Sequence, residues 1–108
     1  MGITIYNKLV RDKIPSIIHK TGGTCITSTL SDKEYLLELD KKLMEELQEY
    51  QESKSLEELA DICEVIRCIV KARGWSIQQL ESKVDEKATK RGTFYNKVFL
   101  ESTDYPDK

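Results

Sequence analysis

Five carboxylates on two neighbouring segments are the residues of this chain best suited to chemistry. Three lie in KLMEELQE and two in EELAD: Glu45, Glu46, Glu49, Glu58 and Asp61. Both segments have helical character, and residues three or four apart on a helix occupy neighbouring surface. Like charges at that spacing repel, so the helix gains no stability from them. A divalent cation such as Mg²⁺ removes this objection, because it takes carboxylate ligands and bridges to substrate phosphates. The pattern therefore predicts metal-dependent phosphate chemistry.

The alternative interpretation is a solvated acidic face, since helices rich in Glu and Lys are common. Glu58 also has an ordinary structural role available, as the third residue of a capping box that begins at Ser55. Against this, Glu46 lies at the edge of the apolar stripe of its helix, and Glu58 shares a face with Ile62 and Val65. An unpaired buried carboxylate is costly. The spacing leaves both interpretations open and directs Glu58 towards the core.

Cationic side chains suited to phosphate occur near both ends of the chain. Lys87 and Arg91 are four residues apart at the end of an expected helix, where the alternative role is to complement the helix dipole. The segment NKLVRDK adds Lys8, Arg11 and Lys13, which fit a solvated basic segment equally well. Arg binds phosphate bidentately and Lys binds it as a point charge. All five are candidate substrate-binding residues.

Four helical segments are expected to position these groups. The first is short, has Pro15 in its first turn and ends near Gly22. Three longer helices are expected at about 32–53, 56–73 and 77–90. Each of these begins with a capping-box pair: Ser31 with Glu34, Ser55 with Glu58, and Ser76 with Gln79.

Apolar residues at helical spacing predict how these helices pack. The stripe of the first long helix is Leu36, Leu39, Leu43, Leu47 and Tyr50. The second long helix has a broader apolar face, which suggests more than one neighbour: Leu59, Ile62, Cys63, Val65, Ile66, Ile69 and Val70. Residues 3–6 and the segment TFYNKVFL predict a short strand or an extended arm. The expected fold is all-α, a bundle of three main helices with extended N- and C-terminal segments.

Length and composition limit the classes of protein to which this chain can belong. The 108 residues predict one domain, spanning 1–108, with a modest core that association between copies would extend. A net charge of −2 argues against a nucleic-acid binder with a basic surface. No apolar run approaches the roughly 20 residues of a membrane span. Three cysteines without framework spacing fit a reducing cytoplasm, and the single His19 leaves no zinc ligand set.

Four sequence blocks, in order, carry a family resemblance: YNKLVRDKIPSII, KLMEELQEY, EELADICEVI and KATKRGTF. Together they resemble the MazG-like, phosphoribosyl-ATP pyrophosphohydrolase-like superfamily of all-α nucleoside triphosphate pyrophosphohydrolases, from Tyr6 to about Leu100. The resemblance implies that Glu45 orients or activates the attacking water and that Lys87 and Arg91 contact phosphates. It also implies that Mg²⁺, with Mn²⁺ as an alternative, is bound by Glu46, Glu49, Glu58 and Asp61. The N-terminal basic residues belong to a shared block without an assigned role.

The implied reaction is hydrolysis of NTP to NMP and pyrophosphate, with nucleotide-pool house-cleaning as its role. The implied assembly is a homodimer or homotetramer in which four-helix bundles form across protomers. One departure from the superfamily pattern is the short spacing of eight residues between Glu49 and Glu58, which still permits a turn that pairs the helices. Two alternatives remain open: a non-catalytic helical interaction module, and a pyrophosphohydrolase of the phosphoribosyl-ATP type.

Overall fold

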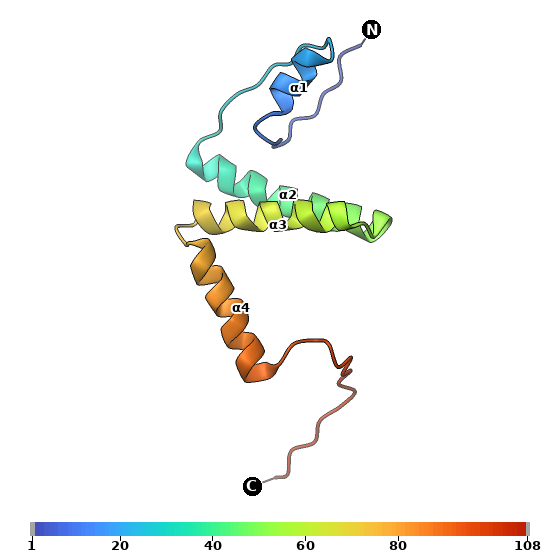
Figure 1. Cartoon of the computed structure of the whole chain (residues 1–108), viewed down its shortest axis with the longest axis vertical. Coiled ribbons are helices and arrows are strands. Elements are labelled where there is room, and N and C mark those ends of the chain that lie inside the picture. Colours follow the sequence, from blue (N-terminus) through green and yellow to red (C-terminus); the bar gives the residue numbers. More distant parts are fainter. Residues whose placement is uncertain (1, 108) are drawn as a thin grey trace. The chain divides into compact units, whose positions relative to one another are not determined.

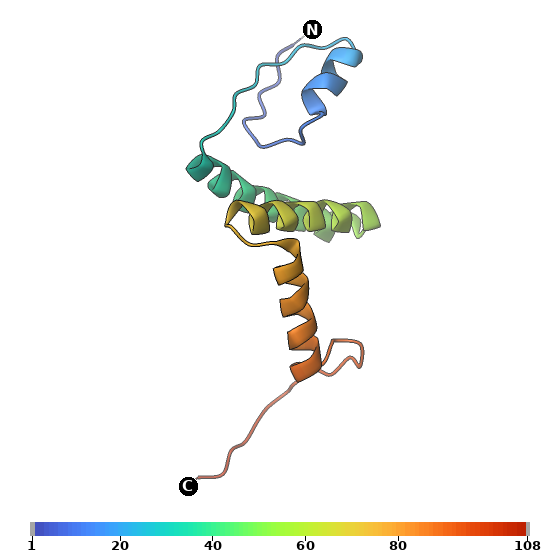
Figure 2. The ribbon, with the colours of Figure 1, turned by 60° about the vertical axis from the view of Figure 1, so that its left-hand side comes forward.

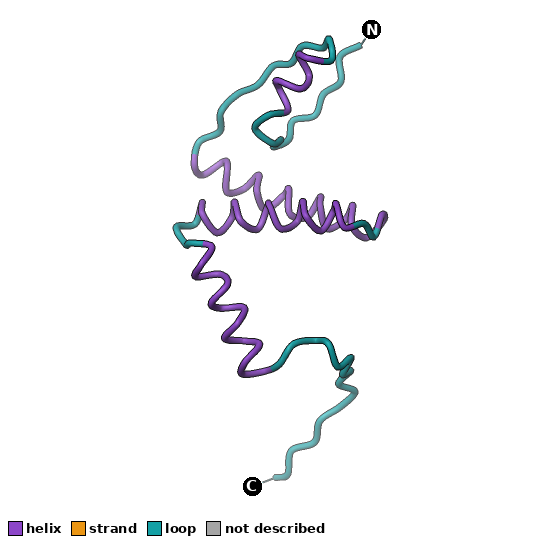
Figure 3. Tube along the Cα trace, viewed as in Figure 1, coloured by secondary structure: helices purple, strands orange, loops and turns teal. Residues whose placement is uncertain are grey.

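The computed structural model describes residues 2–107, and this part of the chain contains four α-helices and no strand (Figures 1 and 3). The helices are α1 (Ile14–Lys20), α2 (Asp32–Ser53), α3 (Leu56–Ala72) and α4 (Ile77–Arg91). The bounds of the three long helices agree with the expected ranges to within one residue. The all-α prediction is therefore confirmed for the described residues.

The chain falls into two compact units that meet in sequence between Ile77 and Gln78. The first unit contains α1, α2 and α3, and the second contains nearly all of α4 and the C-terminal segment. Each unit is described by itself. Among the described helices, none is both long enough and apolar enough to cross a membrane.

The starts of α2 and α3 show how local sequence sets helix boundaries. Ser31 and Glu34 form a complete capping box, in which each backbone N–H donates to the other side chain at 3.2 Å. At α3, the hydroxyl of Ser55 accepts from the backbone N–H of Glu58 at 3.3 Å, but the N–H of Ser55 donates to Ser53 instead. The expected capping-box role of the Glu58 side chain is therefore wrong, which leaves that carboxylate for another purpose.

Helices α2 and α3 lie side by side and run in opposite directions (Figures 1 and 2). Only Lys54 and Ser55 connect them. Lys54 adopts the left-handed conformation, with a φ of 54°, and its N–H donates to the carbonyl of Tyr50 at 2.8 Å. A left-handed residue directly after a helix lets the chain leave the helical path while its last carbonyls remain satisfied. The last turns of α2 consequently lie opposite the first turns of α3.

The core of this hairpin is small. Its fully buried apolar residues are Leu39, Val65 and Val70. Parts of the predicted stripes are exposed, with Leu47 at 44% and Leu59 at 42% of full exposure. Two antiparallel helices cover only the stripes that face each other, so the broad apolar face of α3 extends beyond what α2 covers.

The two segments with strand-like content form no strand in the described chain. Residues 3–6 are irregular, and the segment after α4 contains only a turn and extended backbone. Its large apolar side chains are exposed, for example Phe94 at 98% and Phe99 at 86%. A strand requires a backbone partner at its edge, and none is available within residues 2–107, so the strand alternative is wrong and the extended arm is observed.

Candidate metal centre

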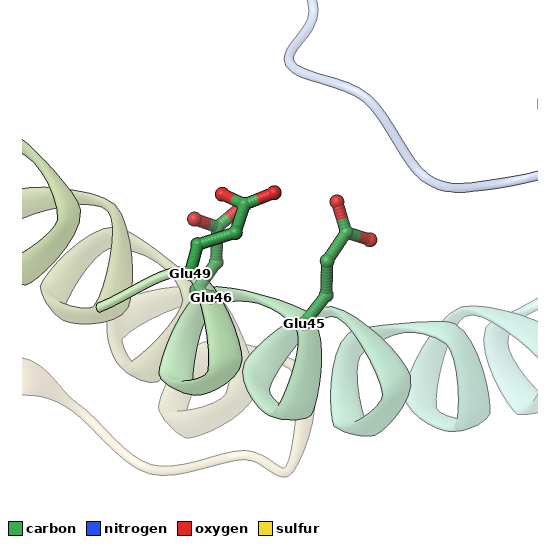
Figure 4. A group of neighbouring side chains, drawn as sticks. All are labelled: Glu45, Glu46 and Glu49. Atoms are coloured by element: carbon green, nitrogen blue, oxygen red, sulfur yellow. The ribbon is translucent and has the colours of Figure 1, made fainter. Parts of the chain in front are cut away.

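Three of the five carboxylates project from one side of α2. Figure 4 shows the carboxyl groups of Glu46 and Glu49 close together, with that of Glu45 beside them. Carboxylate oxygens from all three residues lie within 4.8 Å of one another. The i, i+3 and i, i+4 spacing of a helix produces this grouping.

The hairpin brings two carboxylates of α3 to the same place. Oxygens of Glu58 and Asp61 lie within 4.8 Å of each other and of an oxygen of Glu46. Glu46 thus belongs to both groups. The predicted proximity of the acidic segments on consecutive helices is observed, and it depends on the short connection between α2 and α3.

Glu46 is the most unusual residue of the cluster because it is 5% exposed, and it is the one charged residue among the described residues classed as buried. It lies seven residues after the fully buried Leu39, which places both on the same face of α2. Glu58 is half-buried. Glu58 is directed towards the core side as expected, with its Oε2 buried, but Glu46 is the more deeply buried of the two. Only the packing of α3 on α2 decides which edge of each stripe is covered.

One oxygen of each of these two residues lacks a partner. Glu46 Oε2 and Glu58 Oε2 are both buried, and neither is in a hydrogen bond within the described chain. A buried carboxylate oxygen without a partner carries a large desolvation cost. The arrangement therefore needs either a proton or a cation.

Three cations partly compensate the cluster. The ammonium of Lys8 lies 3.0 Å from Glu45, and the guanidinium of Arg11 lies 2.7 Å from Asp61. Lys42 lies 3.3 Å from Glu45 and 3.5 Å from Glu46. Within residues 2–107, no ion pair reaches Glu49 or Glu58. Five carboxylates against three cations leave the cluster with an excess of negative charge.

Lys42 was missed as a site residue by sequence reasoning. Its side chain is 18% exposed and lies between two carboxylates of the cluster. The signal was present, because Lys42 precedes Glu45 by three residues and Glu46 by four. Repulsion between the acidic residues is therefore only part of the local electrostatics, because a cation lies on the same helix face.

The local electrostatics separate the roles of two carboxylates. Burial, followed by the neighbouring Glu46 and Glu49 carboxylates, raises the pKa of Glu58 to about 7. Burial acts in the same direction on Glu45, but hydrogen bonds from Lys8 and Lys42 outweigh it and lower the pKa of Glu45. Glu58 therefore holds a proton readily, whereas Glu45 stays ionised at neutral pH.

The donor set fits a hard divalent cation. All five groups offer carboxylate oxygens, the ligands that Mg²⁺ takes in proteins. Two oxygens bound to the same Mg²⁺ at about 2.1 Å are at most about 4.2 Å apart, so separations within 4.8 Å require only small side-chain adjustments. The unpartnered oxygens of Glu46 and Glu58 are the atoms that gain most from such a ligand.

A cleft of about 290 Å³ lies between the N-terminal segment and α2, directly beside Glu45. Its volume is near the lower end of small-molecule sites. Its walls carry three amines and two carboxylates, and the complete lining is Tyr6, Asn7, Lys8, Leu9, Glu38, Lys41, Lys42 and Glu45. The cleft thus offers a space that adjoins the acidic cluster and is lined by both amines and carboxylates.

Of the other three predicted phosphate ligands, only Lys13 belongs to the same compact unit as the cluster. Lys13 directly precedes α1, is exposed and forms no ion pair with any described residue. Lys87 and Arg91 are exposed on the last turns of α4, in the second unit. Arg91 also lines a separate cleft of about 290 Å³ with residues 92–94 and 96–98. Phosphate binding by Lys87 and Arg91 stays a prediction.

Comparison with known proteins yields one partial match. A 42-residue part of the chain is 52% identical to an uncharacterized protein of Mycolicibacterium smegmatis, and the match covers 39% of this chain and 43% of that protein. No family model matches the chain. No solved structure matches it either. The name of this relative assigns it no activity.

Proposed function

We propose that this chain is a Mg²⁺-dependent nucleoside triphosphate pyrophosphohydrolase that converts NTP and water to NMP and pyrophosphate, with Mn²⁺ as an alternative metal. The observation that carries the proposal is the buried carboxylate of Glu46, which joins two acidic groups and has an oxygen without a partner. The superfamily resemblance of the acidic and basic blocks supports the same reaction. The corresponding role is removal of unwanted nucleotides in the cytoplasm.

Four carboxylates would hold the metal: Glu46, Glu49, Glu58 and Asp61. When bound, Mg²⁺ supplies charge neutralisation for the leaving pyrophosphate and lowers the pKa of the attacking water. Glu58 releases its proton to become a ligand, which its pKa of about 7 permits at neutral pH. Glu46 is buried beside the core, so it would hold a bound metal at the junction of the two helices.

Glu45 is the proposed base. Its side chain is 30% exposed, so water can reach it, and Lys8 and Lys42 keep it ionised. It lies beside the metal-binding carboxylates and on the wall of the cleft. Glu45 would orient the attacking water and accept its proton, while the other four carboxylates are used in coordination.

Phosphate oxygens require cationic partners. Lys8 and Arg11 already lie on the cluster, and Lys87 and Arg91 match the superfamily block. Positive groups that contact the phosphates stabilise the charge that develops as the anhydride breaks. Lys13, the fifth candidate, forms no ion pair with the cluster in the described structure.

The proposed assembly is a homodimer or homotetramer in which helices of different copies complete a bundle. Exposed apolar side chains on the hairpin support it, namely Leu37, Met44, Leu47, Leu56 and Leu59. The same observation favours the second candidate function, a helical interaction module that associates through this surface and performs no catalysis. The two candidates differ in what Mg²⁺ does to the protein.

The test is pyrophosphate release from a panel of canonical and modified NTPs and dNTPs, with Mg²⁺ and with EDTA. We expect equimolar NMP and pyrophosphate from at least one member, abolished by EDTA and by Asp61→Asn. Other products would indicate a different phosphohydrolase, such as one of the phosphoribosyl-ATP type. No release, together with a melting temperature that Mg²⁺ does not change, would favour the interaction module.

A further inference from the structure

The N-terminal segment crosses the candidate metal centre and contacts both of its helices. Lys8 bonds to Glu45 on α2, 37 residues away in sequence, and Arg11 bonds to Asp61 on α3, 50 residues away. Figure 4 shows this segment on the side to which the carboxylates of α2 project. Two cations that are three residues apart therefore pair with one carboxylate on each of the two helices.

These two ion pairs are the polar contacts that hold the N-terminal segment to the hairpin of α2 and α3. In the described part of the chain, its hydrogen bonds to α2 and α3 are those of Lys8 and Arg11. The segment has no regular structure before α1, and Ile3, Ile5 and Tyr6 are at least 69% exposed. Between the two cations Leu9 is half-buried and Val10 is 39% exposed, so only limited apolar contact adds to the ion pairs that hold the segment at the carboxylates.

A bound divalent cation competes directly with the contact between Arg11 and Asp61, and its charge acts on Lys8 beside the cluster. Arg11 occupies Asp61 Oδ1, and Asp61 belongs to the group whose oxygens would coordinate a metal together with Glu46 and Glu58. Lys8 and Arg11 are 41% and 59% exposed, and exposed ion pairs contribute little stability. A divalent cation placed among the same carboxylates also repels both side chains. Metal binding should therefore release them.

The released cations remain where a phosphate chain would approach. Lys8 lines the cleft beside Glu45, together with Lys41 and Lys42. A triphosphate brings several negative charges, and Arg and Lys bind phosphate oxygens through charge-assisted hydrogen bonds. The substrate thus provides new partners for the side chains that the metal has displaced.

We propose that Lys8 and Arg11 exchange partners during loading of the site: they neutralise Glu45 and Asp61 in the metal-free protein, and they bind the polyphosphate of the substrate once the metal occupies the carboxylates. This inference rests on the proposed function and adds a coupling between metal and substrate. Without metal, the cations are held by the carboxylates and phosphate binds weakly. With metal, the same cations are available, so the ligand recognised is the metal-associated polyphosphate.

The experiment measures two affinities by calorimetry on the full chain: Mn²⁺ alone, and inorganic tripolyphosphate added to the protein in excess Mn²⁺. The variants are Lys8→Ala, Arg11→Ala and their combination, with Lys20→Ala at the end of α1 as the charge-matched control. We expect the double variant to bind Mn²⁺ several-fold more tightly and tripolyphosphate at least ten-fold more weakly. Arg11→Lys should restore part of the tripolyphosphate affinity, and Lys20→Ala should change neither value.

Opposite changes in the two affinities are the signature of partner exchange. A purely structural clamp would instead weaken Mn²⁺ binding in the double variant, and this result would overturn the inference. Unchanged tripolyphosphate affinity would overturn it as well, even with normal Mn²⁺ binding and activity in the wild type. If the wild-type protein binds no Mn²⁺ at all, the proposed function fails first, so the two failures are distinguishable.

Discussion

At the scale of single residues, the acidic cluster is an electrostatic problem that the chain solves only in part. Lys8, Arg11 and Lys42 balance three negative charges, and the raised pKa of Glu58 lets a proton balance a fourth. Such an arrangement costs stability when the metal is absent. In the proposed function, the same excess of negative charge would attract a divalent cation.

Replacing Glu58 by Gln tests this account directly. Glu58→Gln removes an ionisable group that is half-buried among carboxylates, so at pH 8 the metal-free variant should melt at or above the wild-type temperature. The rise in melting temperature that Mg²⁺ produces should be lost, and pyrophosphate release should fall about 100-fold or more. Differential scanning fluorimetry and a pyrophosphate assay measure the two effects.

The control for this substitution is the neighbouring Glu57→Gln, an exposed Glu in the same turn of α3 that belongs to neither acidic group. It should keep the Mg²⁺-induced shift. If Glu58→Gln also keeps a wild-type shift, Glu58 is not a metal ligand.

The raised pKa of Glu58 predicts the pH dependence of metal-free stability. Between its ordinary value of 4.5 and about 7, the folded protein binds more proton at this group than the unfolded chain does. The free energy of unfolding must therefore fall as the pH rises through this window, with EDTA present. Denaturant titrations across the window measure the slope.

Two comparisons isolate Glu58 as the cause of this slope. The Glu58→Gln variant should lose the contribution of this group, and millimolar Mg²⁺ should oppose the fall, because it favours the ionised carboxyl. If the free energy of unfolding has the same pH dependence in the wild type and in the variant, the pKa assignment is contradicted.

At the scale of elements, the hairpin of α2 and α3 creates the site. The two-residue connection sets the antiparallel pairing, and the pairing brings Glu46 to Glu58 and Asp61. Because Ser55 caps α3 without the Glu58 side chain, the helix start and the acidic site do not compete for the same carboxylate. The hydroxyl of Ser55 therefore serves the helix start, and the carboxylate of Glu58 in the first turn of α3 is left for the acidic cluster.

The capping box of α2 gives a prediction about stability alone. Ser31→Ala removes the hydroxyl that accepts from Glu34 N–H, and an N-cap of this kind contributes about 1 kcal/mol. We expect the free energy of unfolding to fall by about that amount, with little change in Mg²⁺ affinity. Denaturant titrations without and with Mg²⁺ measure both. Ser28→Ala, in the preceding loop, should leave the stability unchanged, and equal losses in the two variants would contradict the role of the cap.

At the scale of the whole molecule, the exposed apolar surface is out of proportion to the core. Three apolar residues are buried among the described residues, whereas large apolar side chains remain exposed on both helices of the hairpin, as at Met44 and Leu56, with 72% and 80% exposure. Apolar surface of this kind is typical of an interaction site. A second copy of the chain would cover it in the proposed assembly.

This assembly predicts a mass and a concentration dependence. In sedimentation velocity, the wild-type protein should behave as a multiple of the 12.5 kDa chain, and its melting temperature should rise with protein concentration. Leu47→Lys places a charge on the exposed apolar stripe of α2 and should shift the distribution towards the monomer. The adjacent Gln48→Lys keeps a donor for Glu52 and serves as the control. A 12.5 kDa species at every concentration would rule out the homo-oligomer.

The sequence alone determined the helices and the grouping of the three carboxylates of α2, because both depend on local rules. Capping residues and apolar periodicity act over a few positions, and they predicted the bounds of α2, α3 and α4 closely. The spacing of Glu45, Glu46 and Glu49 likewise fixed their common side of one helix.

Only the tertiary structure decided which carboxylate is buried and which cations reach the cluster. Packing of α3 on α2 buried Glu46 more deeply than Glu58, and the path of the N-terminal segment brought Lys8 and Arg11 to the cluster without Lys13. These contacts join residues 37 and 50 positions apart. Their formation depends on how separate elements pack and on which charges remain unpaired, and no local pattern of residues contains that information.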